Sequence, residues 1–193
     1  EESSQPGYAG ITLQFVAVRT KPGASPSTGT LTLREETANT FQDLTALGTV
    51  DWVYWNTENP QEVIRKQIET PQISTLTFTS AGSGTSSLTQ ADPSWGKSFA
   101  WTDAGGTSSA GNASGGIALA GDPDTSWSQT QSGDAAAGSK FSFTVPATSQ
   151  KQTLFLYAGS YGATGTLTAS LHSASGVEPI STEIRNSSGI ANK

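Results

Sequence analysis

The chain has 193 residues, of which 34% are hydrophobic and 13% charged, and it contains no cysteine. The formal net charge of −6 comes without any basic patch, which argues against binding of nucleic acid and against docking on anionic lipid. The lack of cysteine excludes disulfides, thiol catalysis and thiolate metal sites. No apolar run approaches the length of a membrane span, so we expect no membrane insertion.

Short blocks of alternating apolar and polar residues follow one another along the chain, separated by segments rich in Gly, Pro, Ser and Asp. Alternation with a period of two indicates half-buried strands, and the intervening segments are typical of turns. The pattern predicts an all-β protein, an antiparallel β-sandwich of jelly-roll type. The predicted strands are 10–18, 30–35, 49–56, 73–80, 97–103, 116–121, 140–146, 152–159 and 165–173.

One segment, 59–69, is a candidate helix. It has no apolar stripe at i, i+3 and i+4, so it fits a turn or a short helix.

The predicted strand 49–56 carries aromatic residues on both faces. Read as a strand, it places Val50, Trp52 and Tyr54 on one face and Trp55 on the other. We expect the first face in the core, together with Trp101, because large aromatic residues anchor a sandwich that is otherwise built from Thr, Ser and Ala. The exposure of Trp55 stays open.

Motifs of common catalytic sites are almost absent. His172 is the single histidine and stands at the end of a predicted strand, where an edge or surface position explains it. Neither H-E-x-x-H nor G-x-S-x-G occurs. A glycosidase needs two carboxylates beside one cleft, and the spacing of the Asp residues does not indicate such a pair. We therefore predict a protein that is not an enzyme.

The segment 121–134 offers oxygen ligands of the kind that Ca²⁺ takes. Asp122, Asp124 and Asp134 lie there beside Ser, Thr and Gly carbonyls, but no EF-hand or nonapeptide register is present. An ordinary loop turn is the favoured explanation of Asp-Pro-Asp. Calcium is the one cofactor candidate, and it ranks behind this simple turn.

Aromatic residues outside the core suggest a carbohydrate-binding alternative, because Trp and Tyr side chains stack on sugar rings. Trp95 and Trp127 stand in polar loop sequences, which favours their exposure. In this interpretation the chain is a carbohydrate-binding module or a lectin-like adhesin with a glycan partner. The candidate residues are Trp55, Trp95, Trp127 and Tyr161.

Several blocks together resemble a β-sandwich module of large secreted bacterial surface proteins. They are "DLTALGTVDWVYW", "RKQIETPQIS", "FAWTDAGGT" and "FSFTVPATSQKQTLFLYAGSYGATGTLTASLHSASG", within about residues 43–176. The resemblance implies an extracellular or cell-surface module without an assigned activity. Two positions depart from it: W-T-D-G is interrupted by an Ala at 101–105, and Ser173 stands where the module has Asp. A polar function of that Asp is therefore not implied.

The ends of the sequence also differ from the module. There, residues similar to "NSSGIAN" lead into a closing strand, whereas here they are followed only by Lys193. An additional strand, "YAGITLQFVAV", precedes the matched blocks. The resemblance thus implies a sandwich that lacks one strand, whose edge must be covered. We predict an N-terminal strand and linker at 1–29 and a β-sandwich domain at 30–193.

Two partners are open to the N-terminal strand. It could fold back in cis, or it could enter the groove of a neighbouring subunit, which is strand complementation in trans. Repeated head to tail, the second arrangement makes a pilus-like or matrix filament. We expect an extracellular structural subunit that polymerises with itself. Its predicted assembly strand contains Ile11, Leu13, Phe15, Val16 and Val18.

Overall fold

The computed structural model describes residues 9–16, 29–37, 41–56, 62–79, 87–91, 98–105, 110–114, 116–120, 140–148, 150–158, 164–171 and 177–185. Most of these residues are in β-strands, which confirms the all-β class. The chain divides into two compact units, one made of Glu1–Ala38 with Pro146–Lys193 and the other of Asn39–Val145.

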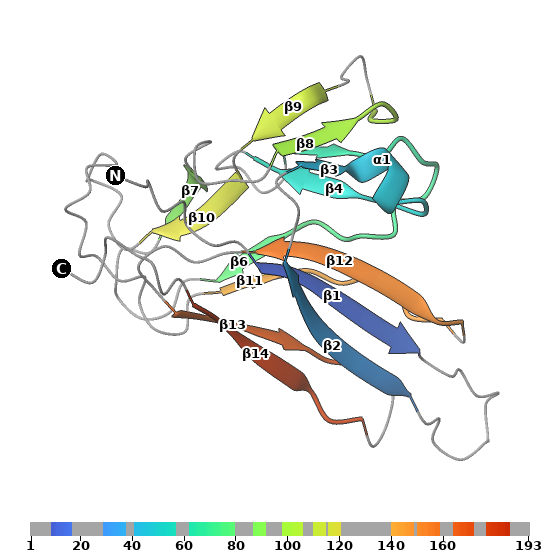
Figure 1. Ribbon diagram of the computed structural model, residues 1–193, viewed down its shortest axis with the longest axis vertical. Coiled ribbons are helices and arrows are strands. Elements are labelled where there is room, and N and C mark those ends of the chain that lie inside the picture. Colours follow the sequence, from blue (N-terminus) through green and yellow to red (C-terminus); the bar gives the residue numbers. More distant parts are fainter. Residues whose placement is uncertain are drawn as a thin grey trace. The chain divides into compact units, whose positions relative to one another are not determined.

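A three-stranded sheet forms part of the first unit. Its strands are β1 (Ala9–Val16), β2 (Thr30–Thr37) and β12 (Gln152–Ala158). The central strand is β1, which pairs antiparallel with β12 on one side and with β2 on the other (Figure 1). Strands β1 and β2, on either side of the predicted boundary at residue 29, therefore belong to the same sheet.

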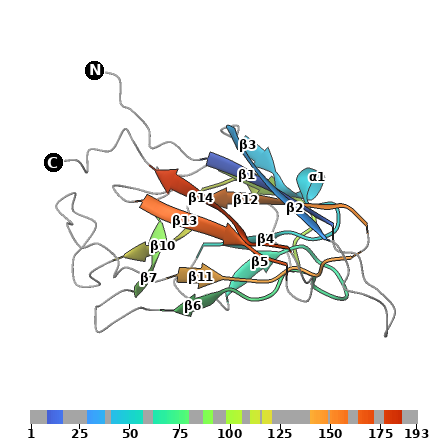
Figure 2. The same ribbon diagram turned by 90° about the horizontal axis from the view of Figure 1, so that it is seen from below.

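A second antiparallel ladder of this unit joins β13 (Thr164–Ala169) to β14 (Ile180–Arg185), which lie side by side in Figure 2. Thr168 is opposite Ser181, and their hydroxyl oxygens are 2.9 Å apart in a hydrogen bond. Cross-strand hydroxyl pairs of this kind stabilise a ladder by fractions of a kcal/mol, up to about 1 kcal/mol.

The predicted alternation is visible in the burial of these strands. In β2, Leu31 and Leu33 are half-buried. The residue that follows each of them, Thr32 and Arg34 respectively, is exposed. The same alternation runs through 152–156 and 165–171. One face of each strand is thus covered and the other open to solvent, as period-two patterning requires.

The second unit is built from shorter strands and one helix. Its elements are β3 (Phe41–Asp43), α1 (Leu44–Leu47), β4 (Val53–Trp55), β5 (Val63–Arg65), β6 (Thr77–Thr79), β7 (Ser87–Ala91), β8 (Ser98–Trp101), β9 (Ala110–Ser114), β10 (Gly116–Ala120) and β11 (Lys140–Ser142). The antiparallel pairs are β4 with β5, β6 with β11, β7 with β10 and β8 with β9.

One ladder departs from the predicted antiparallel arrangement. Strand β3 runs parallel to β8, with Phe41 opposite Ser98 and Asp43 opposite Ala100. Parallel neighbours need a long connection, and the whole stretch from α1 to the start of β8 supplies it.

The candidate helix at 59–69 is wrong for its described residues, because Val63–Arg65 form strand β5. The described residues do contain a helix elsewhere, α1, inside the quoted block "DLTALGTVDWVYW". Asp43 caps α1: its carboxylate accepts hydrogen bonds from the backbone nitrogens of Thr45 at 2.9 Å and Ala46 at 3.2 Å. An Asp at this position satisfies donors that a first helical turn leaves unpaired.

A cluster of aromatic rings forms the core of the second unit. Trp52 and Trp101 are buried, as predicted, with ring centroids 5.6 Å apart. Tyr54 lies 5.4 Å from both Phe99 and Trp101, and this burial raises the pKa of the Tyr54 hydroxyl to about 12. Tilted ring pairs at such distances add about 1 kcal/mol each beyond the area that they bury.

Val50 is a wrong core prediction, because it is 67% exposed. The alternation that placed it beside Trp52 assumes an extended strand from residue 49, but β4 begins only at Val53, and residues 49–50 form a bend. A bend breaks the two-residue periodicity, so the face of a residue before it cannot be counted back from the strand.

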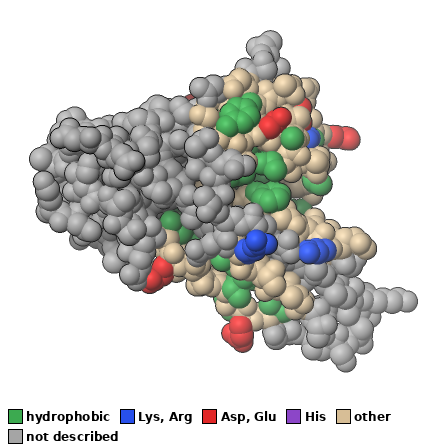
Figure 3. All heavy atoms as spheres, in the orientation of Figure 1, with side chains coloured by type: hydrophobic (Ala, Val, Ile, Leu, Met, Phe, Trp, Pro, Cys, Tyr) green, Lys and Arg blue, Asp and Glu red, His purple; other side chains and the backbone are tan. Residues whose placement is uncertain are grey.

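Hydrophobic side chains also reach the surface of the described part (Figure 3). The exposed large ones are Phe41, Val50 and Phe155. Among the described residues no helix has the length and apolar character of a membrane span.

Candidate functional site

Many candidate site residues lie outside the described residues, and the predictions made for them stay predictions. This holds for the aromatic candidates of a glycan site other than Trp55, for all three calcium candidates, for the histidine and for the last residue of the predicted assembly strand. These residues are Trp95, Trp127, Tyr161, Asp122, Asp124, Asp134, His172 and Val18. In the described part of the chain, no group of three or more His, Asp or Glu residues could hold a metal ion.

Trp55, whose exposure the sequence left open, is half-buried. Its ring lies 5.4 Å from that of Phe143, and its indole nitrogen is buried without a hydrogen-bond partner. A sugar site usually combines a stacking face with accessible donors, and this buried N–H group is not such a donor.

The predicted assembly strand is the central strand of its sheet. Ile11, Leu13, Phe15 and Val16 all belong to β1, and the seven residues from Ala9 to Phe15 each have a partner in both β2 and β12. The structure thus brings the strand together with two strands of its own chain, which is the cis arrangement. We call the position between β2 and β12 the β1 slot.

An open groove also lies in the first unit, between β2 and β14, with a volume of about 490 Å³. It is lined by Leu31, Thr32, Leu33, Ile180, Ser181 and Thr182. Two of these residues, Leu31 and Leu33, are also aligned with Phe15 and Leu13 of β1, so the groove adjoins the β1 slot on its β2 side.

The carboxylate of Asp103 joins three segments of the second unit. Its Oδ1 atom accepts hydrogen bonds from Thr45 Oγ1 at 2.6 Å and from Trp52 Nε1 at 2.9 Å. Its Oδ2 atom is 2.9 Å from the ammonium of Lys66, which also donates to the carbonyl of Gly48 at 2.9 Å. One side chain thus connects α1, the residue before β4 and the residue after β5.

These contacts keep Asp103 ionised. Partial burial acts to raise the pKa of the carboxyl group, but the hydrogen bonds from Thr45, Lys66 and Trp52 and the charge of Lys66 outweigh it. The pKa of Asp103 is therefore held below its ordinary value. An acid that is charged at neutral pH and occupied by three donors is poorly suited to proton transfer, which needs a pKa near the working pH.

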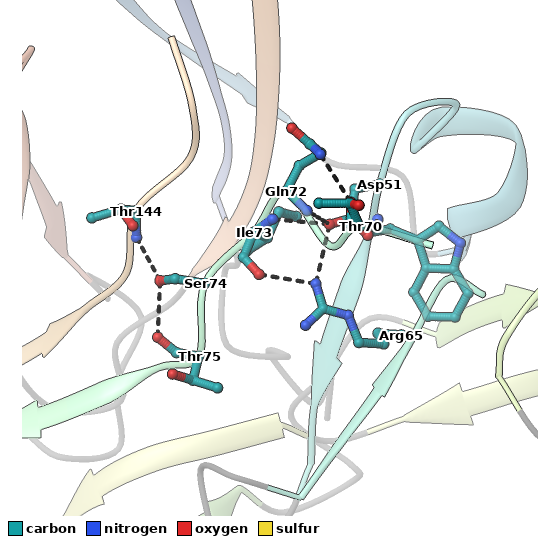
Figure 4. Close-up of polar contacts among 9 residues, drawn as sticks. Asp51, Arg65, Thr70, Gln72, Ile73, Ser74, Thr75 and Thr144 are labelled. Atoms are coloured by element: carbon teal, nitrogen blue, oxygen red, sulfur yellow. Dashed lines mark hydrogen bonds and ion pairs between the residues drawn. The ribbon is translucent and has the colours of Figure 1, made fainter. Parts of the chain in front are cut away.

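A second carboxylate, that of Asp51, anchors the segment before β6 (Figure 4). Its Oδ2 atom accepts from the backbone nitrogens of Gln72 at 2.8 Å and Ile73 at 2.9 Å, and from Arg65 Nη2 at 3.1 Å. Its Oδ1 atom accepts from the backbone nitrogen of Trp52 at 2.8 Å. The side chain is only 3% exposed, so these four donors replace water around the buried charge.

The cations of both clusters are neighbours in sequence, Arg65 and Lys66, and sequence reasoning missed their role. Arg65 also donates to the carbonyl of Ile73 at 2.9 Å. Backbone bonds reinforce the same region: Lys66 N to Trp52 O, Gln67 N to Asp103 O and Gly105 N to Arg65 O. Two adjacent cations in a chain with only 13% charged residues, within a quoted block, were the available signal.

Both carboxylates thus hold segments of the chain together through donors of the chain itself. The residues involved fall in the stretches "DLTALGTVDWVYW", "RKQIETPQIS" and "FAWTDAGGT". Chemically, the arrangement is a pair of polar cross-links beside an aromatic core.

Comparison of the chain with protein-family models, with curated proteins and with solved structures finds no match.

Proposed function

We propose that the protein is a non-catalytic, extracellular structural subunit that assembles into a pilus-like or matrix filament by exchange of strand β1. The observation that carries this proposal is the central position of β1 in its sheet. A central strand contributes hydrogen bonds on both sides, so the strand that occupies the β1 slot decides whether the sheet is complete.

Exchange between copies needs no new interface chemistry. A neighbour's β1 would form the same two ladders that the chain's own β1 forms in cis, which is the low-cost route of domain swapping. The connection from β1 to β2 spans residues 17–29. Most hairpin loops have about two to five residues, so this connection is much longer than a hairpin loop. A long connection gives β1 the reach to leave its slot. Repeated head to tail, the swap does not close and produces a filament.

Other features support a structural role. The carboxylates of Asp51 and Asp103 are both occupied as cross-links between segments of the chain. The alternation of half-buried and exposed residues in β2, β12 and β13 fits sheets that cover one face, which supports a β-sandwich. The resemblance of the quoted blocks to the secreted surface module supports the extracellular location.

A disulfide that locks β1 in its own slot tests the proposal. The native chain has no cysteine, so Gln14→Cys with Thr32→Cys, a directly opposed pair of β1 and β2, introduces the only thiols. We expect the reduced double variant to form filaments in electron microscopy and the oxidised one to stay monomeric in light scattering. Reduction should restore assembly.

The matched control is Thr168→Cys with Ser181→Cys, which locks β13 to β14 and leaves β1 unconstrained. This variant should assemble whether oxidised or reduced. Filaments from the oxidised Gln14/Thr32 variant, or from a chain that lacks residues 1–20, would show that β1 exchange is not the mechanism.

A further inference from the structure

We infer that the β1 slot is a selective binding site for an extended peptide, and that its selectivity depends on the position of Leu13. The inference rests on the proposed function and names the partner chemistry of that site: a strand, supplied by the chain itself or by a second copy, with an apolar residue at this central position.

The register distinguishes Leu13 from the other large apolar residues of β1. It is aligned with Leu33 of β2 and with Leu154 of β12. We call three residues aligned across β2, β1 and β12 a row. In the row through Leu13, the residues on both sides are leucine.

The flanking rows are mixed. Ile11 is aligned with Leu156 on one side but with Glu35 on the other. Phe15 is aligned with Leu31 on one side but with Gln152 on the other. Each of these rows therefore contains one polar side chain, which the row through Leu13 lacks.

The burial of the two neighbouring strands shows which face this row belongs to. Leu33 and Leu154 are both half-buried, whereas Arg34 and Phe155 next to them are exposed. Directly opposed residues share a face of a sheet, so the row through position 13 belongs to the covered face.

A charge at position 13 would have to be accommodated between two leucines on that face. A carboxylate there loses hydration and has no aligned donor from either neighbouring side chain, which weakens the binding of the strand. At position 12 the aligned residues, Arg34 and Phe155, are exposed, so a carboxylate keeps its water. The slot should therefore reject a strand with a charge at 13 and accept one with a charge at 12.

Peptide exchange into the full chain tests this. A protease site inserted between residues 22 and 23 allows the folded chain to be cut, so that no covalent bond links β1 to β2 and β12. Fluorescent peptides with the sequence of residues 8–18 then compete with the cut strand, and binding is followed by anisotropy. The peptides are the native sequence, Leu13→Asp and, as the matched control, Thr12→Asp.

We expect the native peptide to displace the cut strand, the Thr12→Asp peptide to bind within about threefold of it, and the Leu13→Asp peptide to bind at least about tenfold more weakly. Equal binding of the two Asp peptides would overturn the selectivity of position 13. Failure of the native peptide to enter a cut, folded chain would overturn the slot as a peptide site. If the cut chain unfolds, the test uses the uncut Leu13→Asp and Thr12→Asp variants, and the urea concentration at the midpoint of unfolding is measured for each. We expect a lower midpoint for Leu13→Asp, and equal midpoints overturn the inference.

The result is separable from the proposed function. Selective exchange of peptides in a protein that never forms filaments would leave the peptide site standing and contradict the filament. Filaments that form equally well from the Leu13→Asp and native chains would contradict the role of Leu13 and leave β1 exchange standing.

Discussion

The indole nitrogen of Trp52 donates a hydrogen bond of 2.9 Å to the carboxylate of Asp103, although the two residues are 51 positions apart in the chain. Trp52 is 4% exposed and belongs to the aromatic core, whereas Asp103 also binds Thr45 and Lys66. The bond therefore connects the hydrophobic core of the second unit to its polar cross-links.

Replacement of Asp103 should destabilise the second unit in a graded way. Asp103→Ala removes the acceptor of Trp52 and Thr45 and leaves the Lys66 ammonium without its carboxylate, so we expect a loss of about 2–3 kcal/mol in the free energy of unfolding. Asp103→Asn can keep a carbonyl oxygen for these two hydrogen bonds, but it loses the charge and places an NH2 donor where Oδ2 faces the Lys66 ammonium, so its loss should be smaller than that of Asp103→Ala. Urea unfolding measures both, and an equal loss for the two variants would contradict the role of the hydrogen bonds.

The stability contributed by Asp103 should depend on pH. Its folded pKa is lowered, so the folded state binds the proton less tightly than the unfolded chain does. The contribution is present above the ordinary pKa of 3.8 and is lost as pH falls through the lowered folded value. The difference in urea midpoint between native protein and Asp103→Asn should thus be constant from about pH 7 to pH 5 and shrink below about pH 4. A difference that grows on acidification would have the wrong sign.

Strand patterning made the first unit largely predictable. Leu31 and Leu33 alternate with Thr32 and Arg34, and a sheet with one covered face imposes that alternation directly. The partner of each strand was not predictable, because alternation fixes a face but not a neighbour. That is why cis and trans pairing of Leu13 could not be distinguished from the sequence.

The second unit was less predictable because its elements are very short. Three-residue strands such as β3 and β5 carry too few residues to show a period, and contacts from distant segments decide their structure. Helix α1 has four residues and could not be stable alone. Its Asp43 cap was a readable signal, whereas the bonds of Asp103 to Thr45 and Trp52 depend on the folded chain.

Gly48 should not tolerate a side chain. A Cβ atom at this position would lie 2.6 Å from Trp52 Cβ and 2.8 Å from the carbonyl oxygen of Asp51, so both would have to shift. We expect Gly48→Ala to lower the free energy of unfolding by about 1–3 kcal/mol. Gly105→Ala is the matched control, because nothing lies within 4 Å of its added Cβ. The prediction fails if the two variants have the same melting temperature.

Val50 and Trp52 should respond very differently to substitution, although simple alternation places them on one face. Val50 is 67% exposed, so Val50→Ser should change the free energy of unfolding by less than about 0.5 kcal/mol. Trp52→Ala removes a buried ring and should cost about 3–5 kcal/mol. Thermal unfolding distinguishes the two. A large loss of stability for Val50→Ser would indicate that Val50 lies on the core face of a regular strand, and this would contradict the bend at residues 49–50.

A double-mutant cycle should show that Asp51 and Arg65 depend on each other. Asp51→Ala leaves the Arg65 guanidinium, 22% exposed, without its carboxylate and removes the acceptor of the Gln72 and Ile73 backbone nitrogens. We expect a loss of about 3–5 kcal/mol, since removal of one partner of a buried ion pair leaves the other uncompensated. Arg65→Met should cost less, because three backbone nitrogens, those of Trp52, Gln72 and Ile73, still donate to Asp51. The double variant should then be more stable than the sum of the two losses predicts, by about 1–2 kcal/mol.

Additive losses would mean that Asp51 acts through its backbone donors alone and that the 3.1 Å contact to Arg65 contributes no measurable stability.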